Sequence, residues 1–178
     1  MLRQFIVCDV ETTGFSPVKN EIIQFCGVRY NGPNPEEELC VYIKQLEPLP
    51  DKIVEITGIT DEYLNANGVD PLEAYRQIME FCAGCYIFVG HNITHFDWPF
   101  LTVFCRKHGN GGEVQALQLI DTMLIGKSLC GGRWPKLSIL CNLLRIDFDE
   151  QKAHNATYDV IKTAECLFEL VRKQMVWA

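Results

Sequence analysis

The part of the chain that most constrains its fold is residues 5–14, FIVCDVETTG, an apolar run that carries two carboxylates and stops at a glycine. A continuous apolar run of this length is typical of a buried central strand. Side chains alternate faces along a strand, so Asp9 and Glu11 project from the same side. Two like charges held this close repel each other, and a bound cation or a shifted proton relieves the repulsion. The spacing therefore indicates a metal site.

The alternative is that Asp9 and Glu11 lie on an exposed strand edge, because charged residues are mostly found in solvent. Their position favours the metal site. The pair follows an apolar run and stands at its C-terminal end, which is where open α/β sheets bind their ligands.

Length and composition describe one globular domain over residues 1–178, with 48% hydrophobic and 22% charged residues. No apolar run is long enough to span a bilayer and no signal-peptide pattern is present, so we expect an intracellular protein, cytoplasmic or nuclear, that does not bind membranes. The nine cysteines are expected to be buried hydrophobes in a reducing compartment rather than a disulfide framework. Cys82 and Cys85 have Cys-x-x-Cys spacing, for which packing is favoured over a metal or redox site.

The net charge of −7 argues against a broad basic surface for duplex binding. It does not exclude nucleic acid, because carboxylates that hold divalent cations present positive charge to a phosphate. The most basic part of the chain is residues 126–136, which contain Lys127, Arg133 and Lys136.

Five strands are expected. Apolar runs at 22–30 and 39–44 flank the turn-forming residues 31–35, so together with the first strand they predict an antiparallel meander. Residues 86–89 and 117–120 are short, apolar and strand-like.

Helices are expected near 61–64, after Asp70, at or next to Asp97, around 137–144, and from about 156 to 173. Helical spacing predicts which side chains face the core. For the helix after Asp70 these are Leu72, Tyr75, Met79 and Cys82; for the one at Asp97, Phe100, Leu101, Phe104 and Cys105; for the last, Ile161, Ala164, Phe168 and Val171. On local grounds alone Asp97 is an ordinary N-cap.

Three motifs can now be considered together: DVETTG at 9–14, HNITHFD at 91–97 and HNATYD at 154–159. In order and separation they resemble the exonuclease motifs of the DnaQ-like DEDDh exonucleases. The second is one residue longer than in bacterial proofreading subunits and, with the following Trp98 and Pro99, is closest in spacing to the TREX-like branch. Residues 56–60, ITGIT, also resemble a substrate-binding segment of that family. The resemblance covers nearly the whole chain.

The resemblance implies an α/β fold of the ribonuclease-H-like type, a five-stranded mixed sheet flanked by helices, and hydrolysis of nucleic acid from its 3′ end. It implies that Asp9 bridges two Mg²⁺ or Mn²⁺ ions, with Glu11 and Asp159 on the nucleophile-side ion and Asp97 holding the second, partly through water. Two such cations activate water and stabilise the leaving oxygen. His154 would be the general base, because a neutral imidazole has a pKa near working pH.

The resemblance further implies substrate contacts. Gly14 and Phe15 would meet the terminal nucleotide, with Phe15 against its base and Ile59 on the other side, and Thr12 and Thr57 beside them. Stacking tolerates any base, so little sequence specificity is expected. For Phe15, packing on the core is an equal alternative. His91 and Asp121 are expected to be supporting structure.

We therefore expect a metal-dependent exonuclease acting on single-stranded 3′ ends of DNA or RNA, with DNA slightly favoured. Two alternatives remain open: a catalytically weak nucleic-acid-binding scaffold on the same fold, and a phosphodiesterase limited to short oligonucleotides. The sequence names no protein partner.

Overall fold

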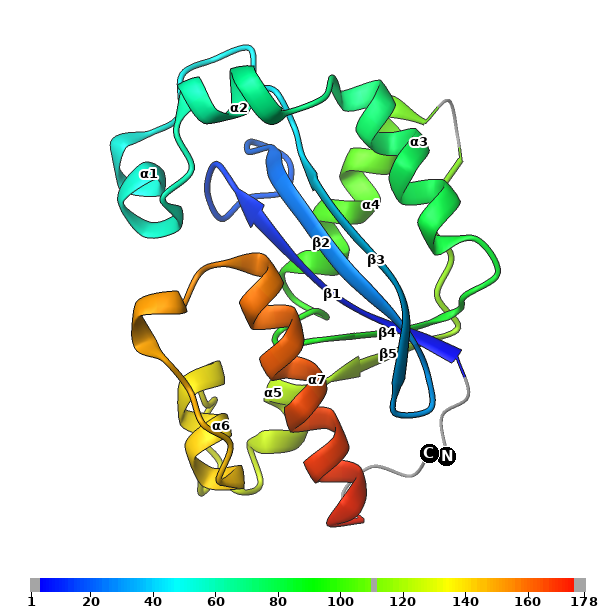
Figure 1. The fold of residues 1–178 in the computed structure, drawn as a ribbon, viewed down its shortest axis with the longest axis vertical. Helices are drawn as coiled ribbons and strands as arrows, with labels where there is room; N and C mark the ends of the chain where they lie inside the picture. Colours follow the sequence, from blue (N-terminus) through cyan, green and yellow to red (C-terminus); the bar gives the residue numbers. More distant parts are fainter. Residues whose placement is uncertain (1–3, 110–111, 175–178) are drawn as a thin grey trace.

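The computed structural model describes residues 4–109 and 112–174, which form one five-stranded mixed sheet with helices on both faces (Figure 1). The strand order is β3-β2-β1-β4-β5. β2 pairs antiparallel with β1 and with β3, whereas β4 pairs parallel with β1 and with β5. The predicted meander and mixed sheet are confirmed. The strands are β1 Gln4–Thr12, β2 Ile22–Asn31, β3 Asn34–Tyr42, β4 Ile87–Gly90 and β5 Gln118–Asp121.

The turn between β2 and β3 is tighter than expected. Asn31 pairs with Asn34, so only two residues connect the strands, and Gly32 takes the left-handed conformation (φ 59°) that such a turn requires. β3 therefore begins five residues before the expected start. Pro35 does not prevent this, because β3 is an edge strand and a proline needs no partner on the open side.

The helices in the described residues are α1 Asp51–Thr57, α2 Asp61–Asn67, α3 Pro71–Cys82, α4 Asp97–His108, α5 Thr122–Gly126, α6 Leu137–Leu144 and α7 Ala156–Arg172, with a 3₁₀ turn at Glu150–Lys152. Two short helices were not predicted. α1 buries no residue and has no side-chain cap, so it lacks the signals that sequence reasoning uses. None of the described helices combines the length and apolarity needed to cross a membrane.

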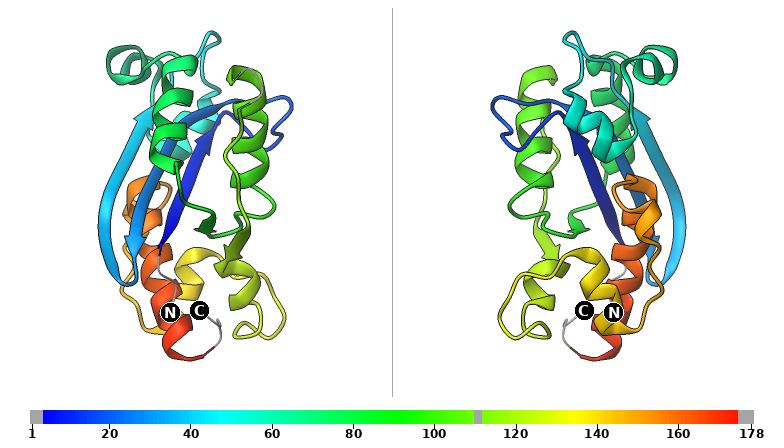
Figure 2. Two further views of the ribbon diagram at one scale, coloured as in Figure 1. Left: turned by 90° about the vertical axis from the view of Figure 1, so that its right-hand side faces the viewer. Right: turned by 90° about the vertical axis from the view of Figure 1, so that its left-hand side faces the viewer.

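Alternation along β1 divides the core between the two faces of the sheet (Figure 2). Ile6 and Val10 pack with α3 and α4, whereas Phe5 and Val7 pack with α7. Asp9 and Glu11 have the parity of Phe5 and Val7, so they lie on the face that α7 covers.

The buried faces of two helices differ from the predicted ones. On α3 the buried residues are Ala74, Ile78, Phe81 and Cys82, and Leu72 is 45% exposed. On α7, Ile161 is 43% exposed and its neighbour Val160 is buried. Both helices carry two adjacent apolar rows, so helical spacing alone does not fix which row faces the core; on α7 the predicted Ala164 is buried and Phe168 and Val171 pack against the core. The predicted face of α4 is confirmed.

Cys82 and Cys85 are free and buried in the core, which confirms the packing interpretation. One pair departs from the expectation of free thiols. Cys26 and Cys40 are directly opposite each other on β2 and β3, with Cα atoms 4.2 Å apart, and form a disulfide. Sequence spacing could not reveal this pair, because it depends on the strand register.

Candidate active site

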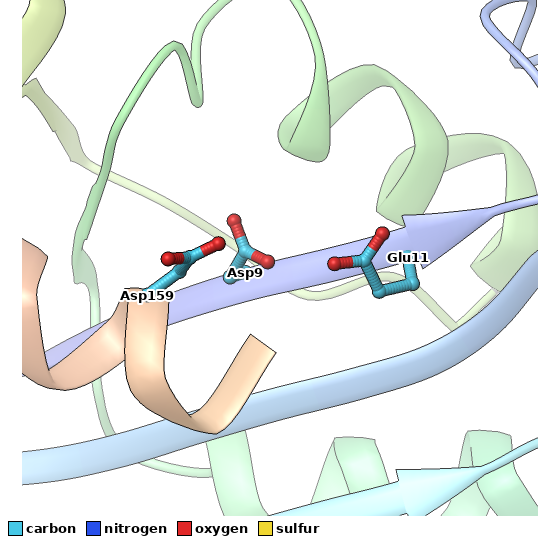
Figure 3. Close-up of side chains that lie close together, drawn as sticks. All are labelled: Asp9, Glu11 and Asp159. Atoms are coloured by element: carbon cyan, nitrogen blue, oxygen red, sulfur yellow. The ribbon is translucent and has the colours of Figure 1, made fainter. Parts of the chain in front are cut away.

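Three carboxylates converge where β1 ends beside the first turn of α7. Asp9 and Glu11 come from β1 and Asp159 from α7 (Figure 3). Each offers one oxygen, and these three oxygens lie within 4.8 Å of one another. The structure thus brings together residues that are up to 150 positions apart in the chain, as expected from their predicted roles.

The start of α7 holds Asp159 in place. The side chain of Asn155 caps the helix by accepting a hydrogen bond from the Tyr158 N–H at 3.1 Å. The preceding His154 has a left-handed backbone (φ 62°), and its N–H donates to Oδ2 of Asp159 at 3.1 Å. The His154 side chain is exposed and lines the same cleft as the carboxylates. This residue therefore positions Asp159 through its backbone and presents its imidazole to solvent.

Asp97 is attached to β1 through a backbone group. β1 pairs with β4 only at Ile6 and Val7, so the Val10 N–H further along has no strand partner on that side. Oδ1 of Asp97 accepts it at 3.0 Å. Asp97 is the first residue of α4 and does not cap it, so the N-cap alternative is wrong. It is buried in the cleft wall, outside the three-carboxylate group.

The carboxylates hold their protons unusually tightly. Burial raises the pKa of Asp9 well above its usual range, and the charges of Asp97, Glu11 and Asp159 raise it further. Burial, followed by the charge of Asp159, raises the pKa of Glu11 to about 8. Burial also raises the pKa of Asp97 to about 7 and that of Asp159 to about 6, although backbone N–H groups oppose both shifts. Burial, together with repulsion between the carboxylates, thus places the charged site under strain.

Oδ1 of Asp159 indicates how this strain is relieved. It is buried and has no hydrogen-bond partner among the described residues. A buried carboxylate oxygen left without a partner is costly, and divalent cations such as Mg²⁺ take oxygen ligands of this kind. The residues present fit a divalent metal.

The carboxylates open into a cleft of about 460 Å³. Thr12, Gly14, Phe15 and Thr57 line it, as predicted. Phe15 is 84% exposed, so the alternative that it packs on the core is wrong. Its ring meets that of Phe96 edge to face, with 6.5 Å between centroids. Ile59 is not brought to the cleft: it is buried with Ile23, Leu49 and Leu64, because the chain turns at Gly58 (φ 70°) and points it inward.

The loop that carries Phe15 is held by side-chain hydrogen bonds. The Thr12 hydroxyl donates to the Gly14 carbonyl at 2.6 Å, and Oδ1 of Asn20 accepts the Ser16 N–H at 3.0 Å. A Cβ on Gly14 would lie 2.7 Å from the Asn20 side chain. A larger residue at position 14 would therefore displace the Asn20 side chain that helps to hold the loop, which presents Phe15 outward.

Asp121 and His91 are supporting structure, as expected. The buried Asp121 carboxylate accepts the N–H groups of Asn92 and Thr94, at 3.0 and 3.1 Å, and also caps α5. Nδ1 of His91 meets the Thr122 hydroxyl at 3.0 Å, and its Nε2 lies 2.9 Å from the Pro135 carbonyl. These contacts fix the loop that leads to Asp97.

Sequence reasoning gave no role to several residues that line the cleft, among them Ile53, Ile56, Phe96 and Lys136. Ile53 and Ile56 are one turn apart on α1, the helix that was not predicted. Phe96 could have been found, because it directly precedes Asp97 in the second motif. Lys136 carried a signal as well, since it belongs to the most basic segment.

Comparison with known proteins agrees with this geometry. The sequence model of the RNase T-type family, described as exonuclease, matches residues 6–167. The chain is similar to PolC-type DNA polymerase III of Mycoplasma pneumoniae (30% identity; 96% of this chain, 12% of that one) and of Bacillus subtilis (32%; 94% and 11%). It spans only about a tenth of these relatives.

Solved structures share the fold. Exonuclease I of E. coli in complex with a 5cy-dT13 oligonucleotide superposes with a TM-score of 0.78 at 20% identity, over 98% of this chain and 41% of that one. Exonuclease I of Methylocaldum szegediense gives 0.78 at 22% identity, over 97% and 41%. The family match covers most of the chain, and the carboxylate motifs lie together on the expected fold. The chain therefore belongs to the DnaQ-like exonuclease family.

Proposed function

We propose that this domain is a metal-dependent 3′–5′ exonuclease that removes nucleotides one at a time from unpaired ends of DNA or RNA and releases nucleoside monophosphates. The observation that supports this most directly is the three-carboxylate group, with its unpartnered Asp159 oxygen, in an open cleft. The relatives are DNA polymerases and several of the structural neighbours are exonuclease I in complex with oligonucleotides, which supports nucleic acid as the substrate.

Asp9, Glu11 and Asp159 would hold the metal, with Asp97 beside them. Bound there, two divalent cations would supply Lewis-acid activation and neutralise charge on the scissile phosphate. His154 would accept the proton of the attacking water, because its exposed imidazole lines the cleft next to Asp159. Phe15 would stack on the terminal base from its exposed position.

Preference for unpaired ends follows from the same residues. A base stacked on Phe15 within the cleft must be free of its partner. The chain is acidic, and a long duplex would need many phosphate contacts for tight binding. Ribose and deoxyribose differ by one hydroxyl, so we expect tolerance of both sugars, with DNA slightly favoured.

The test is timed digestion of DNA and RNA labelled at the 5′ or at the 3′ end, each single-stranded or as a blunt duplex, with Mg²⁺, Mn²⁺ or EDTA. We expect a ladder that shortens from the 3′ end, faster on single strands, and no products in EDTA. Binding without hydrolysis would support the scaffold alternative. Hydrolysis confined to the shortest oligonucleotides would support the short-substrate phosphodiesterase, and equal rates on blunt duplex would contradict the preference for unpaired ends.

A further inference from the structure

The segment that joins α5 to α6, residues 127–136, carries cations that are available to a ligand (Figure 1). We call it the basic segment. It contains Lys127, Arg133 and Lys136, and none of the eight ion pairs among the described residues includes any of these three. By contrast, Lys152, close to His154 on another side of the cleft, pairs with Asp149 at 3.6 Å. Unpaired cations can bind phosphates without first losing an internal partner.

The basic segment also presents an aromatic ring. Trp134 is 52% exposed, although a tryptophan of a packed core would be buried. Nζ of Lys127 lies over the Trp134 ring, 4.0 Å from its centroid, and the His95 ring meets it edge to face at 6.4 Å. An exposed aromatic ring with a cation beside it and others nearby in the chain is the combination that binds single-stranded nucleic acid: the ring stacks on a base and the cations contact the backbone.

The position of the basic segment relative to the site is fixed. The Nε2 group of His91 can donate to the Pro135 carbonyl at 2.9 Å, and Pro135 itself is buried. This contact fastens the segment to the loop that leads to Asp97. The next residue, Lys136, lines the cleft together with Leu137 and Ser138 at the start of α6. The basic segment is thus a continuation of the cleft wall.

The path of the strand is inferred from the residues that line the cleft. Phe15 and α1 contribute to the lining, and so do Lys136 and the start of α6; α1 lies in the upper half and α6 in the lower half of Figure 1. With the terminal nucleotide at Phe15 and the scissile phosphate at the carboxylates, the remaining strand must leave past another part of the rim. The opening between α1 and residues 151–155 is lined by a single lysine, Lys152, which already pairs with Asp149. The basic segment suits a polyanion better.

We propose that the basic segment binds the nucleotides on the 5′ side of the scissile phosphate, with Lys136 and Arg133 on the backbone and Trp134 against a base. This inference rests on the proposed function and deepens it, because it assigns the path of the single-stranded substrate. It also explains how an acidic domain holds a polyanion: the cations are few but lie along one path.

The experiment compares kcat/KM on a single strand of about a dozen nucleotides with that on a dinucleotide, which is too short to reach the basic segment. For Trp134→Ala we expect the long-to-short ratio to fall about 5- to 150-fold, the usual effect of losing one stacked base. For Lys136→Ala the ratio should also fall, and the slope of log kcat/KM against log salt on the long strand should decrease by about 0.7. Both residues are on the surface, and melting curves verify that the variants fold.

Two controls are matched. Lys44→Ala removes an exposed lysine that is likewise without an ion pair among the described residues but lines a different groove. Tyr86→Ala removes an exposed aromatic at the opposite end of β4 from the site. Both should keep the wild-type ratio.

If Lys44→Ala lowers the ratio as much as Lys136→Ala, the effect is one of net charge and the inference is overturned. An unchanged ratio in Trp134→Ala and Lys136→Ala also overturns it while leaving the proposed function intact. Wild-type protein that cleaves neither substrate overturns both.

Discussion

Two charged regions border the same cleft and are built in opposite ways. The three-carboxylate group lies on regular elements, β1 and α7, is half-buried, and has its pKa values shifted by burial and mutual repulsion. The basic segment lies mostly on turns, is largely exposed, and its cations have no ion-pair partner among the described residues. The difference teaches that groups that must hold a metal are placed by backbone geometry, whereas groups that follow a flexible strand are left free to adjust.

The largest effect is expected from the carboxylate that the proposed metal site depends on most. Asp9→Asn removes a charge while keeping the shape of the side chain, so it should abolish turnover on every substrate and leave the fold intact. The digestion assay and a melting curve measure this together. Glu47→Gln, a matched change at an exposed position away from the carboxylates, should have normal activity. Normal turnover in Asp9→Asn would disprove the metal assignment.

The next effect concerns the proposed base. His154→Ala should lower kcat by about 10²–10⁴-fold, the usual contribution of a positioned general base. The variant should gain activity as pH rises, because hydroxide replaces the missing base. Metal binding should be largely retained, since the contact with Asp159 uses the His154 backbone N–H. His108→Ala serves as the control histidine. Identical pH profiles for wild type and His154→Ala would show that His154 is not the base.

Phe15 belongs to neither charged region and tests whether the terminal base is stacked at all. Phe15→Ala should raise KM about 5- to 150-fold on long and short substrates alike, unlike the variants of the basic segment, which act on long strands only. Phe15→Tyr keeps the ring and should restore the wild-type KM. The control is Leu46→Ala, which removes a fully exposed apolar side chain elsewhere. If Leu46→Ala raises KM as much as Phe15→Ala does, stacking of the terminal base on Phe15 is contradicted.

The same contrast explains what the sequence could predict. Period-two alternation places Asp9 and Glu11 on one face. Asp159 was assigned through the family resemblance, because no local rule brings the start of α7 beside β1. The contact of Asp97 with the Val10 N–H could not be predicted, because it arises where β1 and β4 separate. The burial of Ile59 and the pairing of Cys26 with Cys40 likewise depend on a turn and on a strand register that no local pattern encodes. The basic segment was visible as composition, but its attachment to His91 is a tertiary contact.

The smallest expected effect is on the stability of the metal-free protein, and its sign follows from the raised pKa values. A carboxyl group whose pKa is raised by folding binds its proton more tightly in the folded state, so its contribution favours folding at low pH and is lost as pH rises. The ordinary values are about 4, and those of Asp159, Asp97 and Glu11 are raised to about 6, 7 and 8. Between pH 4 and 8 the free energy of unfolding should therefore lose this contribution, and the thermal unfolding midpoint in EDTA should fall by a few degrees.

Asp9→Asn relieves part of the repulsion, so its midpoint in EDTA should equal or exceed that of the wild type at pH 8, with a smaller fall from pH 5. Added Mg²⁺ competes with protons and should raise the wild-type midpoint more at pH 8 than at pH 5. Scanning calorimetry of both proteins at the two pH values, with EDTA and with Mg²⁺, makes the comparison; parallel wild-type and Asp9→Asn curves would show that the carboxylates do not repel one another as their burial implies.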